Sequence, residues 1–295
     1  MWKILKKKLG QKLIVHRIYE ILYNPLNKGS RKELLYNFIS WYLYFRPLNQ
    51  SLTINLQNNM KSIVYPDSDS GVANLFTKNV DYYENEFVRK ILKKGDFVVD
   101  AGCNVGNRTL VLADIIGGAL LVDANKECLK RLRINFELNK LNMQNYFTVF
   151  KALGCKEQTV MFTDLGGTNC QNKIVECEKN NIKVKSIKMT TIDRELKNIG
   201  NPPCSYLKTD LEGFDLDALM GSKETLKNEN MKLVRFEKWP DRPLKSFINF
   251  FEELDFEIFA IDETGAPNFG QRSVSLAKNL FAISTKHLKY IKLNN

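Results

Sequence analysis

The chain has 295 residues, 44 of them Lys or Arg and 33 Asp or Glu, and its formal net charge is +11 at pH 7. A chain of this length buries a large core without disulfide staples, and no pair of its 6 cysteines has C-x-x-C spacing. Together with only 2 histidines, this disfavours a Cys/His zinc site and indicates a protein of the reducing cytoplasm.

The positive charge is concentrated at the start of the chain. Residues 1–46 contain ten basic and two acidic side chains, so they carry +8 and leave +3 for the remaining 249 residues. A protein that holds nucleic acid on its body needs a basic stripe across that body. The distribution therefore disfavours nucleic acid as a partner.

Residues 1–50 are predicted to form a basic and aromatic helical extension. Lysines flank four large apolar residues at helical spacing: Trp2, Leu5, Leu9 and Leu13. Such a helix suits an anionic lipid surface, so one interpretation is peripheral contact of residues 1–46 with the inner face of the membrane. The alternative is that the helices pack on the protein and the lysines are merely solvated. A second apolar stretch at 33–45 is shorter than the roughly 20 residues that cross a bilayer.

Residues 51–295 are predicted to form one domain, which begins with a hairpin at 51–56 and 61–65 and a helix at 81–92. The expected strands are 97–100, 119–123, 146–151, 205–210, 232–237, 256–261 and 279–284. The expected helices are 107–117, 126–139, 214–228 and 244–254. Strands alternating with helices indicate an α/β fold with a mainly parallel sheet covered on both faces. The span 155–200 breaks the alternation and is expected to be a β-rich insertion on the substrate side.

The segment F-V-V-D-A-G-C-N-V-G at 97–106 predicts a strand, a glycine-bearing turn and the start of a helix. Such a turn brings backbone N–H groups close to a nucleotide-like ligand. The dinucleotide fingerprint is G-x-G-x-x-G, whereas here an acid ends the strand and an asparagine replaces one glycine. An acid repels pyrophosphate and suits the cationic S-adenosylmethionine (SAM), which we favour over a dinucleotide. The candidate loop residues are Asp100, Gly102, Asn104 and Gly106.

A second acid, Asp123, ends the next apolar run, 23 residues after Asp100. In a βαβ unit this position places a carboxylate at the ribose hydroxyls of a bound nucleoside. An ordinary strand–turn–helix without a ligand would not need two acids spaced in this way. Asp123 is therefore predicted to bind the cofactor.

Further acids follow two later strands. Ligands of open α/β sheets bind at the carboxyl ends of the strands, where Asp210, Glu212 and Glu237 are expected. Methyl transfer to a hydroxyl also requires a proton acceptor or a metal, and neither histidine lies in these motifs. We take Asp210 as the first candidate for the catalytic base and Glu237 as the second, while Glu212 is equally well explained by a structural role. Three carboxylates that converge would also suit Mg²⁺.

The tripeptide Asn201-Pro202-Pro203 is similar to the N-P-P-[YF] loop of methyltransferases that act on nucleic-acid and protein amides. In those enzymes the loop follows its strand and ends in an aromatic residue. Here it precedes the strand and is followed by Cys204. Prolines at a helix-to-strand turn explain it better.

Three segments together resemble the FkbM family of SAM-dependent methyltransferases, over roughly residues 51–285. They are V-V-D-A-G-C-N-V-G at 98–106, T-T-I-D at 190–193 and L-K-T-D-L-E-G-F-D-L-D-A-L-M-G-S at 207–222. The first resembles the family's D-x-G-x-N-x-G, and the last resembles its K-[IV]-D-[VI]-E-G-[FY] block. The last segment supplies Lys208, Asp210, Glu212 and Gly213 to that block.

The resemblance implies a class I methyltransferase fold, Rossmann-like, with seven strands of which the last is antiparallel. It also implies O-methylation, commonly of sugars in surface glycans or of hydroxyls on secondary metabolites. The chain has Asp123-Ala124 where the family usually has Glu-Pro, Asp215 in place of a glutamate and Ser222 in place of an alanine. These departures are mild and do not indicate an inactive enzyme.

The expected function is that of a cytoplasmic SAM-dependent O-methyltransferase acting on a sugar hydroxyl of a surface glycan or glycolipid precursor. The alternatives are methylation of nucleic acid or of a secondary metabolite, or a non-catalytic SAM-binding scaffold attached to the membrane. The acceptor itself has no motif in this sequence.

Overall fold

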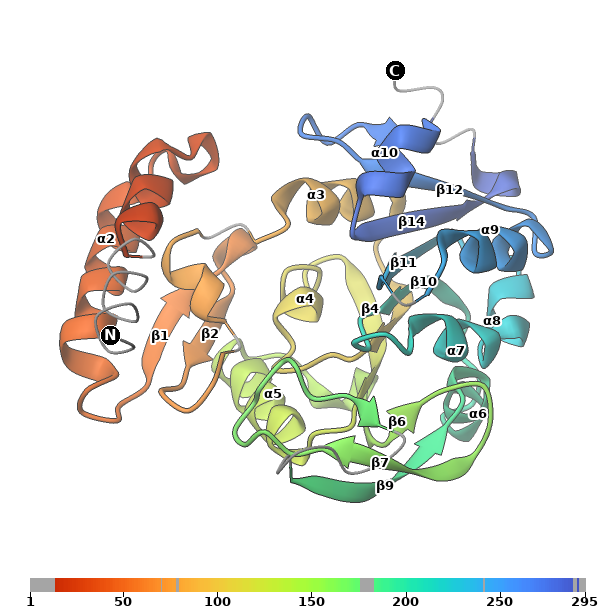
Figure 1. Cartoon of the computed structure of the whole chain (residues 1–295), viewed down its shortest axis with the longest axis horizontal. Helices are drawn as coiled ribbons and strands as arrows, with labels where there is room; N and C mark the ends of the chain where they lie inside the picture. Colours follow the sequence, from red (N-terminus) through yellow and green to blue (C-terminus); the bar gives the residue numbers. More distant parts are fainter. Residues whose placement is uncertain are drawn as a thin grey trace, which may run out of the picture. The chain divides into compact units, whose positions relative to one another are not determined.

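The computed structural model describes residues 14–69, 71–77, 80–175, 183–240, 242–288 and 291 (Figure 1). Internal contacts divide the chain into two compact units, up to Asp81 and from Tyr82 onward. Sequence analysis put the boundary after residue 50. The structure groups the hairpin that follows with the helical extension, so the division comes later.

The first unit consists of short helices and one hairpin. Leu34, Phe38 and Trp41 form part of its buried interior. The hairpin is antiparallel, with Leu52 opposite Val64, as predicted. The described elements are a helix over 14–23, η1 (Pro25–Asn27), α2 (Arg31–Ser40), the π-helical turn η2 (Trp41–Phe45), β1 (Leu52–Asn55), η3 (Gln57–Asn59), β2 (Lys61–Val64) and η4 (Val72–Leu75).

This unit also exposes several large apolar side chains. Tyr23, Tyr36 and Leu43 are 63%, 65% and 78% exposed. The predicted amphipathic helix of Trp2 to Leu13 lies outside the described residues. No helix within the described part of the chain combines the length and the apolar character that a bilayer crossing requires.

The second unit is built on an eight-stranded sheet with the spatial order β13-β12-β14-β11-β10-β3-β4-β5. The five strands from β11 to β5 run parallel, and β14 is antiparallel to both of its neighbours. In chain order the strands are β3 (Asp96–Ala101), β4 (Ile116–Asp123), β5 (Tyr146–Phe150), β10 (Cys204–Thr209), β11 (Leu233–Glu237), β12 (Phe256–Ile261), β13 (Pro267–Asn268) and β14 (Asn279–Ser284).

This architecture confirms the predicted α/β fold, its mainly parallel sheet and its antiparallel last strand. All seven expected strands are present. The eighth, β13, has only two residues, Pro267 and Asn268, and pairs with the edge strand β12. A strand this short has no apolar alternation that a sequence could reveal.

Helices cover both faces of the sheet because neighbouring strand residues point to opposite faces. Phe281 and Phe259 contact Phe87 of α3, whereas Leu280 and Ala282 belong to the cluster that includes the phenylalanines of α9. Figure 1 shows α4 and α5 on one side and α7, α8 and α9 on the other. The helices are α3 (Tyr82–Ile91), α4 (Asn107–Leu110), α5 (Lys126–Leu138), α6 (Ile192–Asn198), α7 (Asp215–Met220), α8 (Lys223–Lys227), α9 (Leu244–Glu252) and α10 (Gln271–Leu276).

Two helices differ from their predicted extents. The helix expected over 107–117 ends at Leu110. The one expected over 214–228 is divided into α7 and α8 around Gly221, whose backbone packs against Gly154 so closely that a Cβ would lie 2.1 Å from the Gly154 carbonyl oxygen. That close approach depends on a residue far away in the sequence, which the local pattern does not contain.

The described part of the span 155–200 contains three strands and the helix α6. A second sheet of four strands has the order β6-β9-β7-β8, and α6 follows it. Its strands are β6 (Ala152–Leu153), β7 (Gln158–Thr163), β8 (Ile174–Val175) and β9 (Val184–Thr190).

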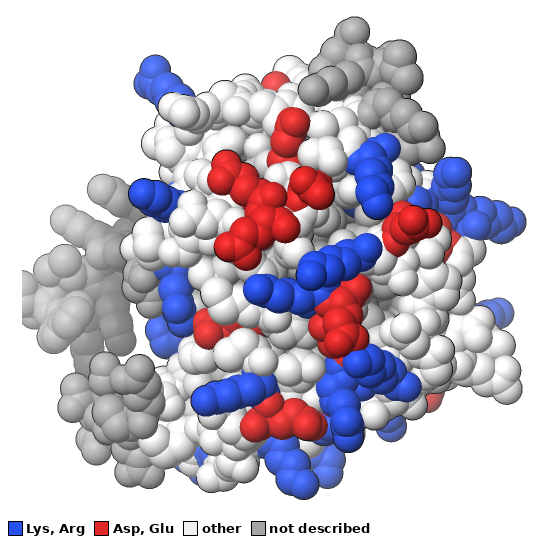
Figure 2. All heavy atoms as spheres, turned by 90° about the vertical axis from the view of Figure 1, so that its right-hand side faces the viewer, with Lys and Arg blue, Asp and Glu red and all other residues white. Residues whose placement is uncertain are grey.

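Figure 2 shows the charges on one face of the molecule. Acidic side chains gather in one part of this face, and over the rest of it basic and acidic side chains are interleaved. The face has no continuous basic area, in keeping with the small net charge beyond residue 46.

Candidate cofactor and catalytic site

The loops that follow β3 and β10 are packed backbone against backbone. The Asp210 N–H donates to the carbonyl oxygen of Ala101 at 3.1 Å. Gly102 has a left-handed φ of +74°, and a Cβ at this position would lie 2.1 Å from the Asp210 carbonyl oxygen. Only glycine allows this contact, which joins the two sequence motifs into one site.

Asp100 lies behind this junction in a buried ion pair. Its Oδ1 is 3.0 Å from Lys208 Nζ, and its Oδ2 accepts a hydrogen bond from Thr109 Oγ1 at 2.7 Å. Lys208 Nζ also donates to the carbonyl oxygen of Gly102 at 2.7 Å. The charge of Asp100, which was expected to suit a cationic ligand, is neutralised by Lys208 in the structure.

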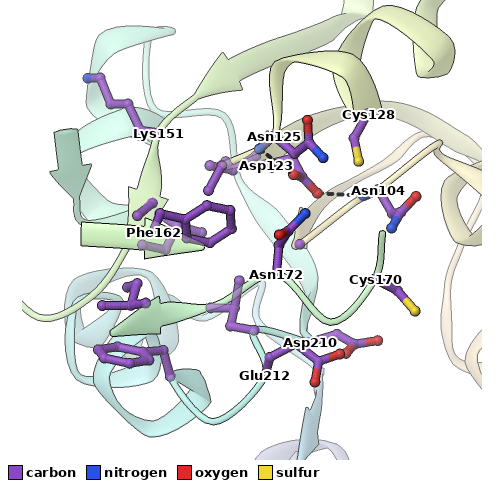
Figure 3. A pocket seen from close by; sticks show the side chains of 18 of the residues that line it. Asn104, Asp123, Asn125, Cys128, Lys151, Phe162, Cys170, Asn172, Asp210 and Glu212 are labelled. Atoms are coloured by element: carbon purple, nitrogen blue, oxygen red, sulfur yellow. Dashed lines mark hydrogen bonds between the residues drawn. The ribbon is translucent and has the colours of Figure 1, made fainter. Parts of the chain in front are cut away.

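A cavity of about 720 Å³, open to solvent, lies beside the two loops (Figure 3). Of the five predicted cofactor residues, Gly102, Asn104 and Asp123 line it. Among the residues that the structure describes, Asp100 and Gly106 are not part of its lining. Gly106, with φ +82°, packs instead against Phe136 of α5, whose ring would be 2.7 Å from a Cβ.

Asp123 is held by backbone donors in the wall of the cavity. Its Oδ2 accepts from Asn104 N at 2.8 Å, as drawn in Figure 3, and its Oδ1 accepts from Asn125 N at 2.7 Å. Burial raises the pKa of Asp123 to about 6, although both N–H groups oppose that change. Asn104 has φ +49°, a left-handed conformation that asparagine adopts more readily than most residues.

The opposite wall comes from the second sheet and its loop. Phe162, Cys170 and Asn172 line the cavity there. Asn125 Nδ2 donates to the carbonyl oxygen of Gly167 at 2.9 Å and so attaches this loop to the start of α5. Sequence analysis assigned the insertion to the substrate side but named none of these residues, because they form no motif.

The three predicted catalytic acids meet at one end of the site. One carboxylate oxygen from each of Asp210, Glu212 and Glu237 lies within 4.8 Å of those of the other two. Figure 3 shows Asp210 and Glu212 together at the edge of the cavity, and both belong to its lining. Glu237, at the end of β11, is 5% exposed and lies outside that lining.

Their surroundings differ. Asp210 Oδ2 is 3.8 Å from Lys208 Nζ and 3.9 Å from Arg235 Nη1. Burial alone would raise the pKa of Asp210, but these cations hold it below its ordinary value. Glu237 accepts a hydrogen bond from Trp239 Nε1 on one oxygen and pairs with Lys278 Nζ on the other.

Among the residues that the structure describes, none forms an ion pair or a hydrogen bond with the Glu212 carboxylate. Burial, followed by the charges of Glu237 and Asp210, raises its pKa to about 7. The convergence of three oxygens agrees with the Mg²⁺ prediction in geometry. However, cationic side chains already lie beside Asp210 and Glu237, and Mg²⁺ stays a prediction.

The sequence that builds this site matches a known family. The profile described as "Methyltransferase FkbM domain" matches residues 100–258, more than half of the chain. The chain belongs to the FkbM methyltransferase family. No curated protein sequence matches it.

The chain is also similar to several solved structures, at low sequence identity. One is methyltransferase FkbM of Methylobacillus flagellatus, at 12% identity and a TM-score of 0.45; the match covers 72% of this chain and 52% of that one. A Streptococcus mutans protein described as a methyltransferase, in complex with SAH, matches at 13% identity and a TM-score of 0.41. This match covers 68% of this chain and 94% of that one. An rRNA methylase of Streptococcus thermophilus matches at 10% identity and a TM-score of 0.41, and the match covers 69% of this chain and 95% of that one. The chain thus spans about half the length of the FkbM structure.

Proposed function

We propose that this FkbM methyltransferase uses SAM and methylates a hydroxyl oxygen of a saccharide, in a surface glycan or glycolipid precursor. The observation that carries the proposal is that one cavity joins Asp123 at one wall to the acids Asp210 and Glu212 at another. The first is suited to a nucleoside, and the others are suited to a reacting hydroxyl.

The residues of the cavity fit SAM. Each oxygen of Asp123 accepts one backbone N–H and has lone pairs left for the two hydroxyls of a ribose. When bound, SAM supplies an electrophilic methyl group on a sulfonium. Gly102 and Asn104 would hold the ligand through close backbone approach.

A hydroxyl acceptor is favoured by the acids at the far end of the cavity. An alcohol must lose its proton on methylation, and a carboxylate within reach provides an acceptor for it. A nucleic-acid acceptor would bind better to a basic surface, whereas the chain beyond residue 46 has a formal net charge of only +3. A hydroxyl on a secondary metabolite would require the same chemistry.

Calorimetric titration with SAM and S-adenosylhomocysteine tests the cofactor. Asp123→Ala removes hydrogen bonds to a charged group, which are worth about 1.5–3 kcal/mol. We therefore expect its SAM affinity to fall by roughly 10-fold to 150-fold, while the exposed control Glu252→Ala binds like the wild type. Folded wild-type protein that does not bind SAM would refute the proposal. A screen of saccharide acceptors, followed by S-adenosylhomocysteine release in EDTA or Mg²⁺, then tests the acceptor and the metal.

We also propose that residues 1–46 bring the enzyme to an anionic membrane surface. Support comes from the +8 charge of this segment and from the exposed Tyr23, Tyr36 and Leu43. The full-length protein with Lys6, Lys7 and Lys8 changed to Glu should lose co-sedimentation with anionic vesicles. A control with the same change in charge alters three exposed lysines of the second unit, Lys227, Lys245 and Lys286. Equal loss in both proteins would contradict a specific role for the segment.

A further inference from the structure

We propose that Glu212 is the general base of this methyltransferase and that Glu237 is a positioning residue beside it. This inference rests on the proposed function, because it concerns the proton that a hydroxyl acceptor must lose. It also reverses the order expected from the sequence, in which Asp210 came first and Glu212 had an equally good structural explanation.

The backbone places Glu212 at the reacting end of the cavity at an energetic cost. Glu212 has φ +52° and Gly213 has φ +101°, so two left-handed residues follow each other on the turn after β10. For a residue with a Cβ this conformation costs about 1–2 kcal/mol. Strained residues of this kind cluster at functional sites. Here the turn places Glu212 in the lining of the cavity, beside Asp210 (Figure 3).

The three acids differ in what already occupies their oxygens. Asp210 lies between Lys208 and Arg235, which favour its ionised form and make it a weak proton acceptor. Glu237 is buried, with Trp239 on one oxygen and Lys278 on the other. Within the part of the chain that the structure describes, no hydrogen bond to the Glu212 carboxylate is present. Glu212 is therefore the member of the cluster whose oxygens are open to a proton from the cavity.

The neighbouring charges tune this acceptor. Glu237 from β11 and Asp210 and Asp215 from the turn and helix after β10 disfavour a negative charge on Glu212, and Lys278 from the start of β14 opposes them. Together with burial they raise the pKa of Glu212 to about 7. A general base works best when its pKa is near the working pH. Glu237 contributes because Trp239 and Lys278 fix it in place as a charge beside Glu212.

The proposed step balances as follows. The acceptor oxygen forms a bond to the methyl carbon, and the carbon–sulfur bond breaks with its electron pair going to sulfur. The hydroxyl proton passes to the Glu212 carboxylate, from which it is later lost to solvent. No oxidant, reductant or further reactant is required.

The first experiment compares wild type, Glu212→Gln and the control Glu263→Gln, an exposed acid away from the cavity. With an acceptor found by the screen, we expect Glu212→Gln to lower kcat at least 100-fold, within the range for general base catalysis. SAM affinity, measured by calorimetry, should change less than threefold. The wild-type pH–rate profile should rise through about pH 7, and this rise should be absent from Glu212→Gln.

The outcomes separate the inference from the proposed function. Wild-type protein that does not bind SAM overturns the proposed function. Normal SAM binding with more than a third of wild-type kcat in Glu212→Gln overturns the inference alone. A readout that needs no acceptor is NMR of the protein labelled with ¹³C at the glutamate carboxyl carbons. We expect one signal to titrate near pH 7 and to disappear in Glu212→Gln; its absence from the wild type overturns the inference.

Discussion

The acid at the end of β3 and the three acids at the ends of β10 and β11 lie at the same edge of the sheet, but their charges are compensated to different extents. At the end of β3, Lys208 forms an ion pair with Asp100 and the Thr109 hydroxyl donates a hydrogen bond to it, so the charge of Asp100 is neutralised inside the protein. At the ends of β10 and β11, three carboxylates lie close together. Asp210 and Glu237 have cationic side chains within 4 Å, whereas among the described residues Glu212 has none. In the function proposed above, the acids with cationic partners hold the loops, and Glu212 at the cavity accepts the proton.

Removing Lys208 should break the buried ion pair between Asp100 and Lys208. Lys208→Met leaves Asp100 as an uncompensated buried charge, and breaking such a pair costs about 3–5 kcal/mol. We expect this loss in the free energy of unfolding, measured with denaturant. The double variant Asp100→Asn with Lys208→Met removes both charges and should recover a large part of the loss. No recovery would mean that the pair is not what stabilises this region.

Glycine at position 102 should be needed to keep the loops after β3 and β10 in contact. Gly102→Ala adds a left-handed backbone cost and an overlap with the Asp210 backbone, together about 3 kcal/mol. Gly200→Ala is the matched control, because Gly200 has φ +88° but nothing within 4 Å of its Cβ position. We expect the control to lose about 1 kcal/mol and to retain SAM binding. Equal losses in the two variants would show that the junction of the loops is not close.

Much of this arrangement was predictable from the sequence, because its signals are local. Apolar runs between turn residues give the seven main strands. The rule that ligands bind at the carboxyl ends of strands selects Asp100, Asp123, Asp210 and Glu237, of which Asp123 and Asp210 line the cavity. The left-handed Asn104 follows from its place in a glycine-bearing turn.

The rest depends on contacts between distant residues. Lys208, which neutralises Asp100, is 108 residues away from it in the sequence. The acid at the end of the strand therefore predicts a ligand, whereas in the structure its charge is taken up by an ion pair. The roles of the three acids depend on Arg235, Trp239 and Lys278, which come from other strands and loops. The division after Asp81 likewise depends on contacts between distant residues, because the hairpin's apolar pattern does not say which residues it contacts.

The smallest predicted effect concerns the charge that Glu237 places beside Glu212. Glu237→Gln removes that charge and frees Lys278, and both changes favour the ionised form of Glu212. The rise in the pH–rate profile should therefore move from about pH 7 to lower pH, toward the ordinary glutamate value of 4.5. Lys278→Ala should move it in the opposite direction, by an amount that salt reduces because Lys278 is exposed. Shifts of the same sign in both variants would show that Glu237 and Lys278 act on the fold of the turn and not on the charge of Glu212.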